Sequence, residues 1–257
     1  LFKVLADFSD TLARDEEGYR AYSNVVANIV KRDDLLHFSA GAVAELIEQG
    51  ARICAQKRRL SSRFSRVADI AREGSFIASK VGKTIVDAED IVAGFRRAKR
   101  RAEMPALRFR RMISERTLLL KVKEQVVGQV NGLAVTSAGP LTYGFPTRIT
   151  ASIGPGNAGA INIERESELS GSVHTKGFLI LSGLLRHALD LKHPMAFSSS
   201  IAFEQTYGGI DGDSASGAEF CCLISALTEI PIRQDLAMTG AVDQKGNVLP
   251  IGAATEK

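Results

Sequence analysis

The sequence has 257 residues, of which 45% are hydrophobic and 24% are charged, and its net charge is +4. This balance is typical of a folded soluble protein with room for two domains. No apolar run approaches the roughly 20 residues that a membrane-spanning helix needs, which excludes a transmembrane helix and predicts no membrane partner.

The three cysteines are Cys54, Cys221 and Cys222. An odd number, with two adjacent on a predicted helix, is a poor basis for disulfides, so a reducing, cytoplasmic location is expected. Neither C-x-x-C nor H-E-x-x-H spacing occurs, and no metal site is predicted. The opening has no basic segment followed by an apolar block and therefore predicts no signal peptide. Because the sequence begins with Leu and stops after "IGAATEK", we expect it to be part of a longer chain.

Residues 1–100 have the periodicity of amphipathic helices. The four predicted helices cover residues 18–33, 40–56, 63–82 and 87–103. Ser39 is a candidate N-cap for the second helix, and Phe76 is expected on the inward face of the third. The fourth has an acidic first turn and a basic last turn, which the helix dipole favours. These patterns predict a small all-helical bundle.

Residues 101–124 are predicted to be a linker, or a helix that joins two domains. Basic residues are concentrated in "KRRLSSRFSR" (57–66) and "FRRAKRRAEMPALRFRRM" (95–112). Such runs could bind nucleic acid or an acidic partner. The alternative is a solvated helix face, and the scarcity of aromatic residues for base stacking favours that alternative.

Residues 125–257 have a different pattern, which predicts a mixed α/β domain. The predicted strands cover residues 127–135, 147–153, 160–164 and 195–203. An apolar helix is predicted over 175–191, another from Ser214 onwards, and a hairpin over 237–251 that turns near "DQKG". The whole chain therefore belongs to the α+β class.

Ser214 follows the glycine-rich loop "GGIDGD" (208–213) and stands where the apolar helix is expected to begin. It could be an ordinary N-cap. It could also be a nucleophile, with Ser216 as a competitor, because N–H groups at a helix start can stabilise an oxyanion. A nucleophilic serine needs a base. Of the four histidines, His174 is the candidate for a Ser-His-Asp triad, and a desolvated Lys257 is the alternative base.

Two segments together resemble the Lon protease family. "YGGIDGDSASGAE" is similar to the nucleophile motif of its LonB-type and Lon-related branch. "MTGAVDQKGNVLPIGAATEK" is similar to the segment that carries the catalytic lysine, and the two positions are 43 residues apart, as is usual in the family. "VGQVNGLAV", "RESELSGSVHTKGFLILSG" and "FEQTYGG" extend the resemblance over 125–257, with a minor departure at "IGAATEK".

This resemblance implies a serine endopeptidase that hydrolyses peptide bonds with a Ser-Lys dyad. Ser214 is the implied nucleophile, Lys257 the implied general base, and Thr239 the residue that orients the lysine. Asp211 and Asp213 flank the serine and are assigned no chemical step. Apolar neighbours such as Val248, Leu249 and Ile251 are expected to desolvate Lys257. Because family members continue beyond this lysine, Lys257 is expected to be disordered or displaced if the chain stops there.

Residues 1–100 resemble, less specifically, the helical lid of an AAA+ ATPase. In "LSSRFSRVADIAREG", Arg63 is the candidate nucleotide-sensing arginine. No G-x-x-x-x-G-K-[ST] occurs, so ATP with magnesium is expected to bind mainly outside this sequence. The resemblance also implies unfolded or damaged proteins as substrates and a homo-oligomeric ring, a hexamer. The alternative function is a catalytically inactive Lon-like module that binds other molecules, including nucleic acid.

Overall fold

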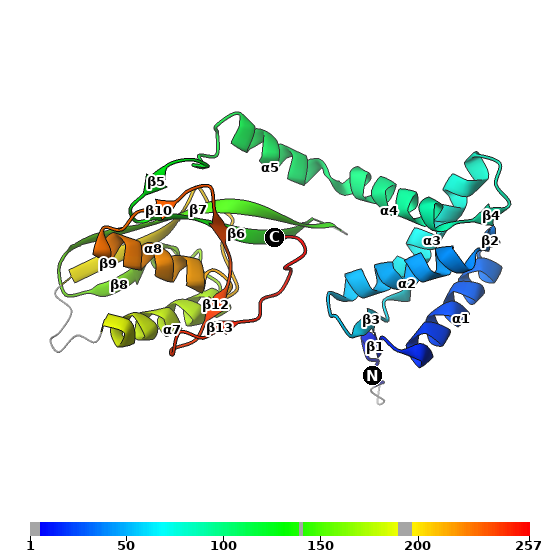
Figure 1. Ribbon diagram of the computed structural model, residues 1–257, viewed down its shortest axis with the longest axis horizontal. Helices are drawn as coiled ribbons and strands as arrows, with labels where there is room; N and C mark the ends of the chain where they lie inside the picture. The colour runs from blue at the N-terminus through cyan, green and yellow to red at the C-terminus, as the bar shows by residue number, and fades with distance from the viewer. Residues whose placement is uncertain (1–5, 139–140, 190–196) are drawn as a thin grey trace, which may run out of the picture. The chain divides into compact units, whose positions relative to one another are not determined.

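The computed structural model describes residues 6–138, 141–189 and 197–257 (Figure 1). The chain divides into two compact units, Leu1–Met104 and Pro105–Lys257. The predicted fold class, a helical bundle followed by a mixed α/β domain, is confirmed. The predicted division into 1–100, 101–124 and 125–257 stays a prediction. Among the described residues, no helix has both the length and the apolar character required to cross a membrane.

The first unit contains the four predicted helices. They are α1 (Glu16–Arg32), α2 (Ala40–Cys54), α3 (Phe64–Lys80) and α4 (Ala88–Ala102). Ser39 caps α2 as predicted, because its Oγ accepts the N–H of Ala42 at 3.2 Å. Asp87 and Asp90 form a reciprocal capping box at the start of α4, which satisfies N–H groups that the helix leaves unpaired.

The core of this unit consists of the inward faces of the helices, with Tyr22, Leu46, Val67 and Ile91 fully buried. The prediction for Phe76 is wrong, since its side chain is 44% exposed. Lys80 and Arg97 each place their cationic group 5.1 Å from the centre of its ring. Cation–π attraction gives an exposed aromatic ring favourable neighbours without burial.

Short strands join the ends of these helices and were not predicted. β1 (Thr11–Ala13) pairs with β3 (Arg59–Ser61), and β2 (His37–Phe38) pairs with β4 (Ile85–Val86). Strands of two or three residues are too short to show the alternation of apolar and polar residues that identifies a strand.

The second unit is built on a five-stranded sheet in the order β11-β6-β7-β9-β8. Its strands are β5 (Gln125–Val126), β6 (Gln129–Ala138), β7 (Leu141–Pro155), β8 (Gly159–Asn162), β9 (Phe197–Glu204), β10 (Ile232–Arg233), β11 (Ala237–Met238), β12 (Ala241–Val242) and β13 (Val248–Leu249). β6, β7 and β9 are successively antiparallel, whereas β8 and β11 join the sheet in parallel. β5 and β10 form a separate antiparallel pair.

Two helices cover one face of this sheet, α7 (Ser172–Leu189) and α8 (Ser216–Thr228) (Figure 1). Their apolar faces meet side chains of β6, β7 and β9, among them Ile149, Ile201 and Phe203. On β9 every second residue faces the core, since Ser199, Ile201 and Phe203 are buried, as expected of a strand with one buried face. The remaining helices are α5 (Met104–Ser114) and the short α6 (Ile163–Glu166).

The prediction of a hairpin over 237–251 is correct only at its centre. β12 and β13 are antiparallel around the turn at Asp243, whose side chain accepts N–H groups of Lys245 and Asn247. Residues 237–238 instead form β11 and pair in parallel with β6. Parts of two other predicted elements, residues 190–191 of the helix and 195–196 of the strand, lie outside the described residues.

Candidate active site

Ser214 lies in the turn between β9 and α8. The helix begins at Ser216 rather than at Ser214, and Ala215 occupies the N-cap position, so the predicted helix start is two residues too early and Ser214 is not an N-cap. The carbonyl of Ser214 accepts the N–H of Gly240 at 2.7 Å and the hydroxyl of Thr239 at 3.1 Å. The segment after β11 therefore holds the serine backbone in place.

Lys257 reaches the same point from the end of the sequence. Its Nζ donates to Oγ of Ser214 at 2.8 Å and to Oγ1 of Thr239 at 3.0 Å. The structure thus brings together the three residues that the sequence singled out, Ser214, Lys257 and Thr239. The expectation that Lys257 would be displaced is wrong, because its amine makes both bonds.

The surroundings of Lys257 favour the neutral amine. Burial lowers the pKa of Lys257 below its ordinary value, and the negative charge of Asp213 opposes that shift. A desolvated ammonium loses hydration that a neutral amine scarcely needs. Of the residues expected to supply this desolvation, Val248 and Leu249 are 73% and 40% exposed, and their contribution stays a prediction.

The geometry does not favour Ser216 as the nucleophile or His174 as the base. Ser216 is only 2% exposed, and its Oγ accepts the N–H of Val242 at 3.0 Å. His174 is 1% exposed, with ring nitrogens 2.9 Å from Oγ of Ser170 and 3.2 Å from Oε1 of Glu219. His174 therefore bonds to a different serine and does not form a triad with Ser214.

Asp211 shapes the loop that precedes Ser214. One carboxylate oxygen of Asp211 accepts the N–H groups of Val173 and His174 at the start of α7, and that of Gly212 within the loop. These three bonds hold the pKa of Asp211 below its usual value, with the Gly212 bond contributing most. Asp211 joins the loop to α7, in line with the expectation that it takes no chemical step.

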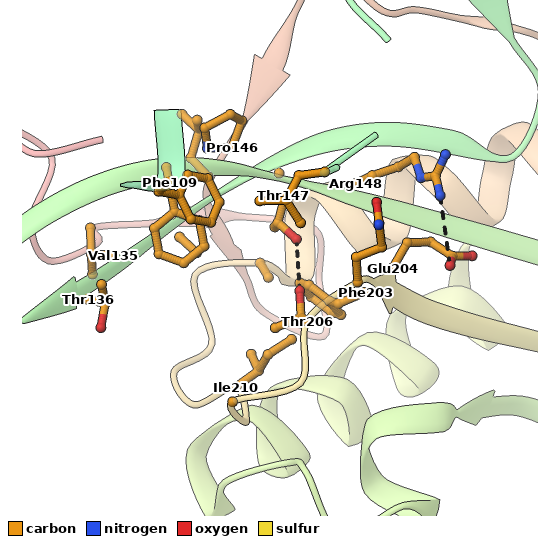
Figure 2. Close-up of a pocket in the computed structure, with 18 of the residues that line it drawn as sticks. Phe109, Val135, Thr136, Pro146, Thr147, Arg148, Phe203, Glu204, Thr206 and Ile210 are labelled. Atoms are coloured by element: carbon orange, nitrogen blue, oxygen red, sulfur yellow. Dashed lines mark hydrogen bonds and ion pairs between the residues drawn. The ribbon is translucent and has the colours of Figure 1, made fainter. Parts of the chain in front are cut away.

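A pocket of about 360 Å³ adjoins the Ser214–Lys257 pair, and both residues line it. Figure 2 shows its other walls, with Phe109 beside Pro146 and with Thr147 bonded to Thr206. Phe109 comes from α5, and its ring centre lies 4.5 Å from that of Phe145 on β7. A concave site with mostly apolar walls and a few polar groups is typical of a binding site.

Sequence reasoning missed two residues near this site. A β-carbon at Gly144 of β7 would overlap the carbonyl oxygen of Glu256 and approach Cα of Lys257. A glycine inside a strand is a signal of close backbone approach, and this signal could have identified Gly144. Phe109 had no comparable signal, because its contact with Phe145 joins α5 to a strand far along the chain.

Arg63 lies in the helical unit at the start of α3. It is exposed, and its backbone N–H donates to Oγ of Ser61 at 3.2 Å. Its guanidinium could contact a phosphate. The sequence has no G-x-x-x-x-G-K-[ST] loop, the motif whose backbone surrounds the phosphates of a nucleotide. Several arginines of the basic runs form salt bridges with glutamates, such as Arg101 with Glu73 and Arg111 with Glu115. Such pairs are typical of a solvated helix face.

Comparisons with known proteins divide the chain in a similar way. Residues 37–101 match the family model described as archaeal LonB, AAA+ ATPase LID domain. Residues 113–257 match the model of the Lon protease (S16) C-terminal proteolytic domain.

The chain is also similar over nearly its whole length to named relatives. It is 32% identical over 259 residues to a Lon protease homolog of Escherichia coli (strain K12), covering 99% of this chain and 43% of the relative. It is 32% identical over 244 residues to an archaeal Lon protease of Thermococcus kodakarensis, covering 94% of this chain and 37% of the relative. It is 31% identical over 266 residues to an archaeal Lon protease of Thermoplasma acidophilum, covering 99% of this chain and 38% of the relative. The chain therefore spans less than half the length of these relatives.

Proposed function

This chain belongs to the Lon protease family, and from that premise we propose that it is a serine endopeptidase with Ser214 and Lys257 as its catalytic dyad. The observation that carries the proposal is the 2.8 Å contact between Nζ of Lys257 and Oγ of Ser214. A nucleophile within hydrogen-bond reach of its base, with a third group orienting the base, is the arrangement that covalent catalysis needs. Thr239 is that third group.

The reaction is hydrolysis of a peptide bond through an acyl-enzyme. The neutral amine of Lys257 takes the proton of the Ser214 hydroxyl while Oγ attacks the carbonyl carbon. The resulting ammonium then gives that proton to the departing amine nitrogen, which leaves an ester on Ser214. Water hydrolyses the ester with Lys257 again as base, and this step releases the carboxyl product and restores the serine.

The turn before α8 supports stabilisation of the oxyanion. Over the described residues, the backbone N–H groups of Ser214 and Ala215 donate to no backbone carbonyl. They lie next to the N-terminus of α8, where the helix dipole favours negative charge. Donors fixed in this way stabilise the charge that develops on the carbonyl oxygen of the substrate.

The substrates are unfolded or damaged proteins, whose extended segments can enter the pocket beside Ser214. ATP with magnesium drives their delivery, and its binding site lies mainly in a part absent from this sequence, with Arg63 as a contributing contact. The active assembly is a homo-oligomeric ring, a hexamer. A cytoplasmic location accords with the free cysteines Cys54, Cys221 and Cys222.

The rival function is a binding module without protease chemistry, one that uses its basic runs to hold nucleic acid. That module has no need of a partly desolvated lysine bonded to a serine. The pairing of Ser214 with Lys257 therefore favours the peptidase.

The test is peptide cleavage by the complete protein with Ser214→Ala and Ser216→Ala as a matched pair. We expect Ser214→Ala to abolish cleavage. Ser216→Ala should retain it while losing about 1–3 kcal/mol of stability, because the N–H of Val242 loses its acceptor. Full activity in Ser214→Ala together with its loss in a folded Ser216→Ala would refute the assignment.

A further inference from the structure

A buried pair of ionisable side chains, His174 and Glu219, takes no part in the proposed chemistry. Their side chains are each 1% exposed, and Nε2 of His174 lies 3.2 Å from Oε1 of Glu219. Burial of ionisable groups is costly unless they are paired. A buried ionisable pair that takes no part in the chemistry is therefore a candidate for a role in positioning the residues around it.

The two residues belong to two helices that adjoin the loop that carries Ser214. Glu219 lies in the first turn of α8, the helix that follows Ser214. His174 lies in the first turn of α7, and its Nδ1 is 2.9 Å from Oγ of Ser170. The contact between His174 and Glu219 thus joins the start of one helix to the start of the other.

The segment around Ser170 is itself paired with the loop before Ser214. Gly171 donates its N–H to the carbonyl of Ile210 at 2.7 Å, and Ile210 donates to the carbonyl of Leu169 at 2.8 Å. A continuous chain of contacts therefore runs from the loop through Ser170 and His174 to Glu219. It returns along α8 to the residue after Ser214, because the N–H of Glu219 donates to the carbonyl of Ala215 at 2.9 Å.

The charges around the pair favour a cationic histidine. Burial works against the charged form of His174, but the hydrogen bond and charge of Glu219, with the charges of Glu164 and Asp211, raise its pKa. Phe203 of β9 adds an aromatic edge contact at 5.4 Å. Asn162 donates to Oε1 of Glu219 at 3.5 Å, whereas Oε2 has no partner among the described residues. Among the described residues, the Glu219 side chain is therefore held through Oε1 alone, by His174 and Asn162.

We infer that His174 and Glu219 are positioning residues, which hold the loop of residues 208–213 and the start of α8 at the spacing that presents Ser214 to Lys257. Neither residue touches the reacting atoms. The effect on turnover rests on the proposed function, whereas the effect on the loop does not.

The test compares Glu219→Gln, His174→Gln and the double variant in the complete protein, with Ser225→Ala as matched control. Ser225 is a buried polar residue at the other end of α8, bonded to Gly128 and Ile230. Its loss should lower the melting temperature without moving the loop. Melting temperatures identify folded variants, steady-state peptide cleavage gives kcat and KM, and hydrogen exchange reports on the amides of Gly171 and Ile210.

We expect each single variant to exchange these two amides faster than wild type. We also expect kcat to fall about tenfold or more with KM nearly unchanged, because a small misplacement of a reacting group is costly. The double variant should lose no more than the worse single variant, since either change breaks the same contact. Ser225→Ala should leave kcat and both amides unchanged.

Unchanged exchange at Gly171 and Ile210 in folded Glu219→Gln would overturn the inference, as would a loss of kcat no greater than that of Ser225→Ala. If Glu219→Gln and His174→Gln both fail to fold, the same exchange measurement is made on Ser170→Ala. That variant removes the hydroxyl between His174 and the segment paired with the loop, together with the hydroxyl's contacts to Thr175 and Gly171. Faster exchange in these variants, together with an active Ser214→Ala, would refute the proposed nucleophile and leave the positioning pair standing.

Discussion

Gly144 of β7 lies directly against the backbone of Glu256, so that a β-carbon at position 144 would overlap the Glu256 carbonyl oxygen. This strand thereby sets how closely the segment before Lys257 can approach the sheet. The position of the candidate base depends on a residue that has no side chain and that lies in a different element.

The variant Gly144→Ala should therefore push Lys257 away from Ser214. We expect peptide cleavage to fall about tenfold or more, because even about 1 Å of misplacement can cost a hundredfold. The matched control is Gly154→Ala on the same strand, where a β-carbon would meet nothing within 4 Å. Its activity should equal that of wild type, and its stability should change by about 1 kcal/mol or less. Equal activity in the two variants would contradict the role given to Gly144.

The pH dependence of cleavage should follow the deprotonation of Lys257. Burial lowers the pKa of Lys257, and its neutral form is the base, so activity should rise as pH increases through that lowered pKa. Asp213 raises the same pKa by its charge. Asp213→Asn should therefore lower the pKa of Lys257 further. In a plot of kcat against pH, the rising part of the curve should then move to lower pH. Asp235→Asn is the control and should leave the curve in place, since Asp235 is paired with Arg233. A shift of the curve to higher pH in Asp213→Asn would contradict this account.

Arg63 is expected to couple nucleotide to proteolysis, because a guanidinium can bind phosphate in a bidentate manner. In the complete protein, Arg63→Ala should weaken ATP-stimulated cleavage of a folded protein and spare cleavage of a short peptide. Arg20→Ala, at an exposed arginine of α1 paired with Glu16, is the control. If Arg63→Ala reduces both activities equally, or neither, then Arg63 is a surface residue without a role in sensing.

Much of the fold could be predicted because it depends on local patterns. The four helices of the first unit follow the spacing of residues such as Tyr22 and Val26, and the Ser39 cap precedes α2 in sequence. Ser214, Lys257 and Thr239 could be selected because their motifs are short and the spacing between them is characteristic of the family. The structure places them together, and their catalytic roles stay predictions.

The features that could not be predicted depend on which strands pair and which helices pack together. The register of β11 against β6 removes residues 237–238 from the expected hairpin. The register of β7 brings Gly144 to Glu256, and the packing of α7 against α8 brings His174 to Glu219. A glycine inside a strand signals a close backbone approach at Gly144, but nothing local in the sequence identifies the partner in any of these contacts, because they join residues far apart in the chain.

The central claim is that Lys257 activates Ser214, and the most direct measurement is covalent labelling of the complete protein by diisopropyl fluorophosphate. Peptide mass spectrometry locates the adduct, and its rate of formation is compared between wild type and Lys257→Arg. We predict a single catalytic adduct on Ser214 in wild type, formed faster as pH rises. Lys257→Arg should form almost none, because its guanidinium stays protonated and cannot accept the serine proton. Labelling of Ser214 at the wild-type rate in Lys257→Arg, or an adduct on Ser216 instead, would contradict the account.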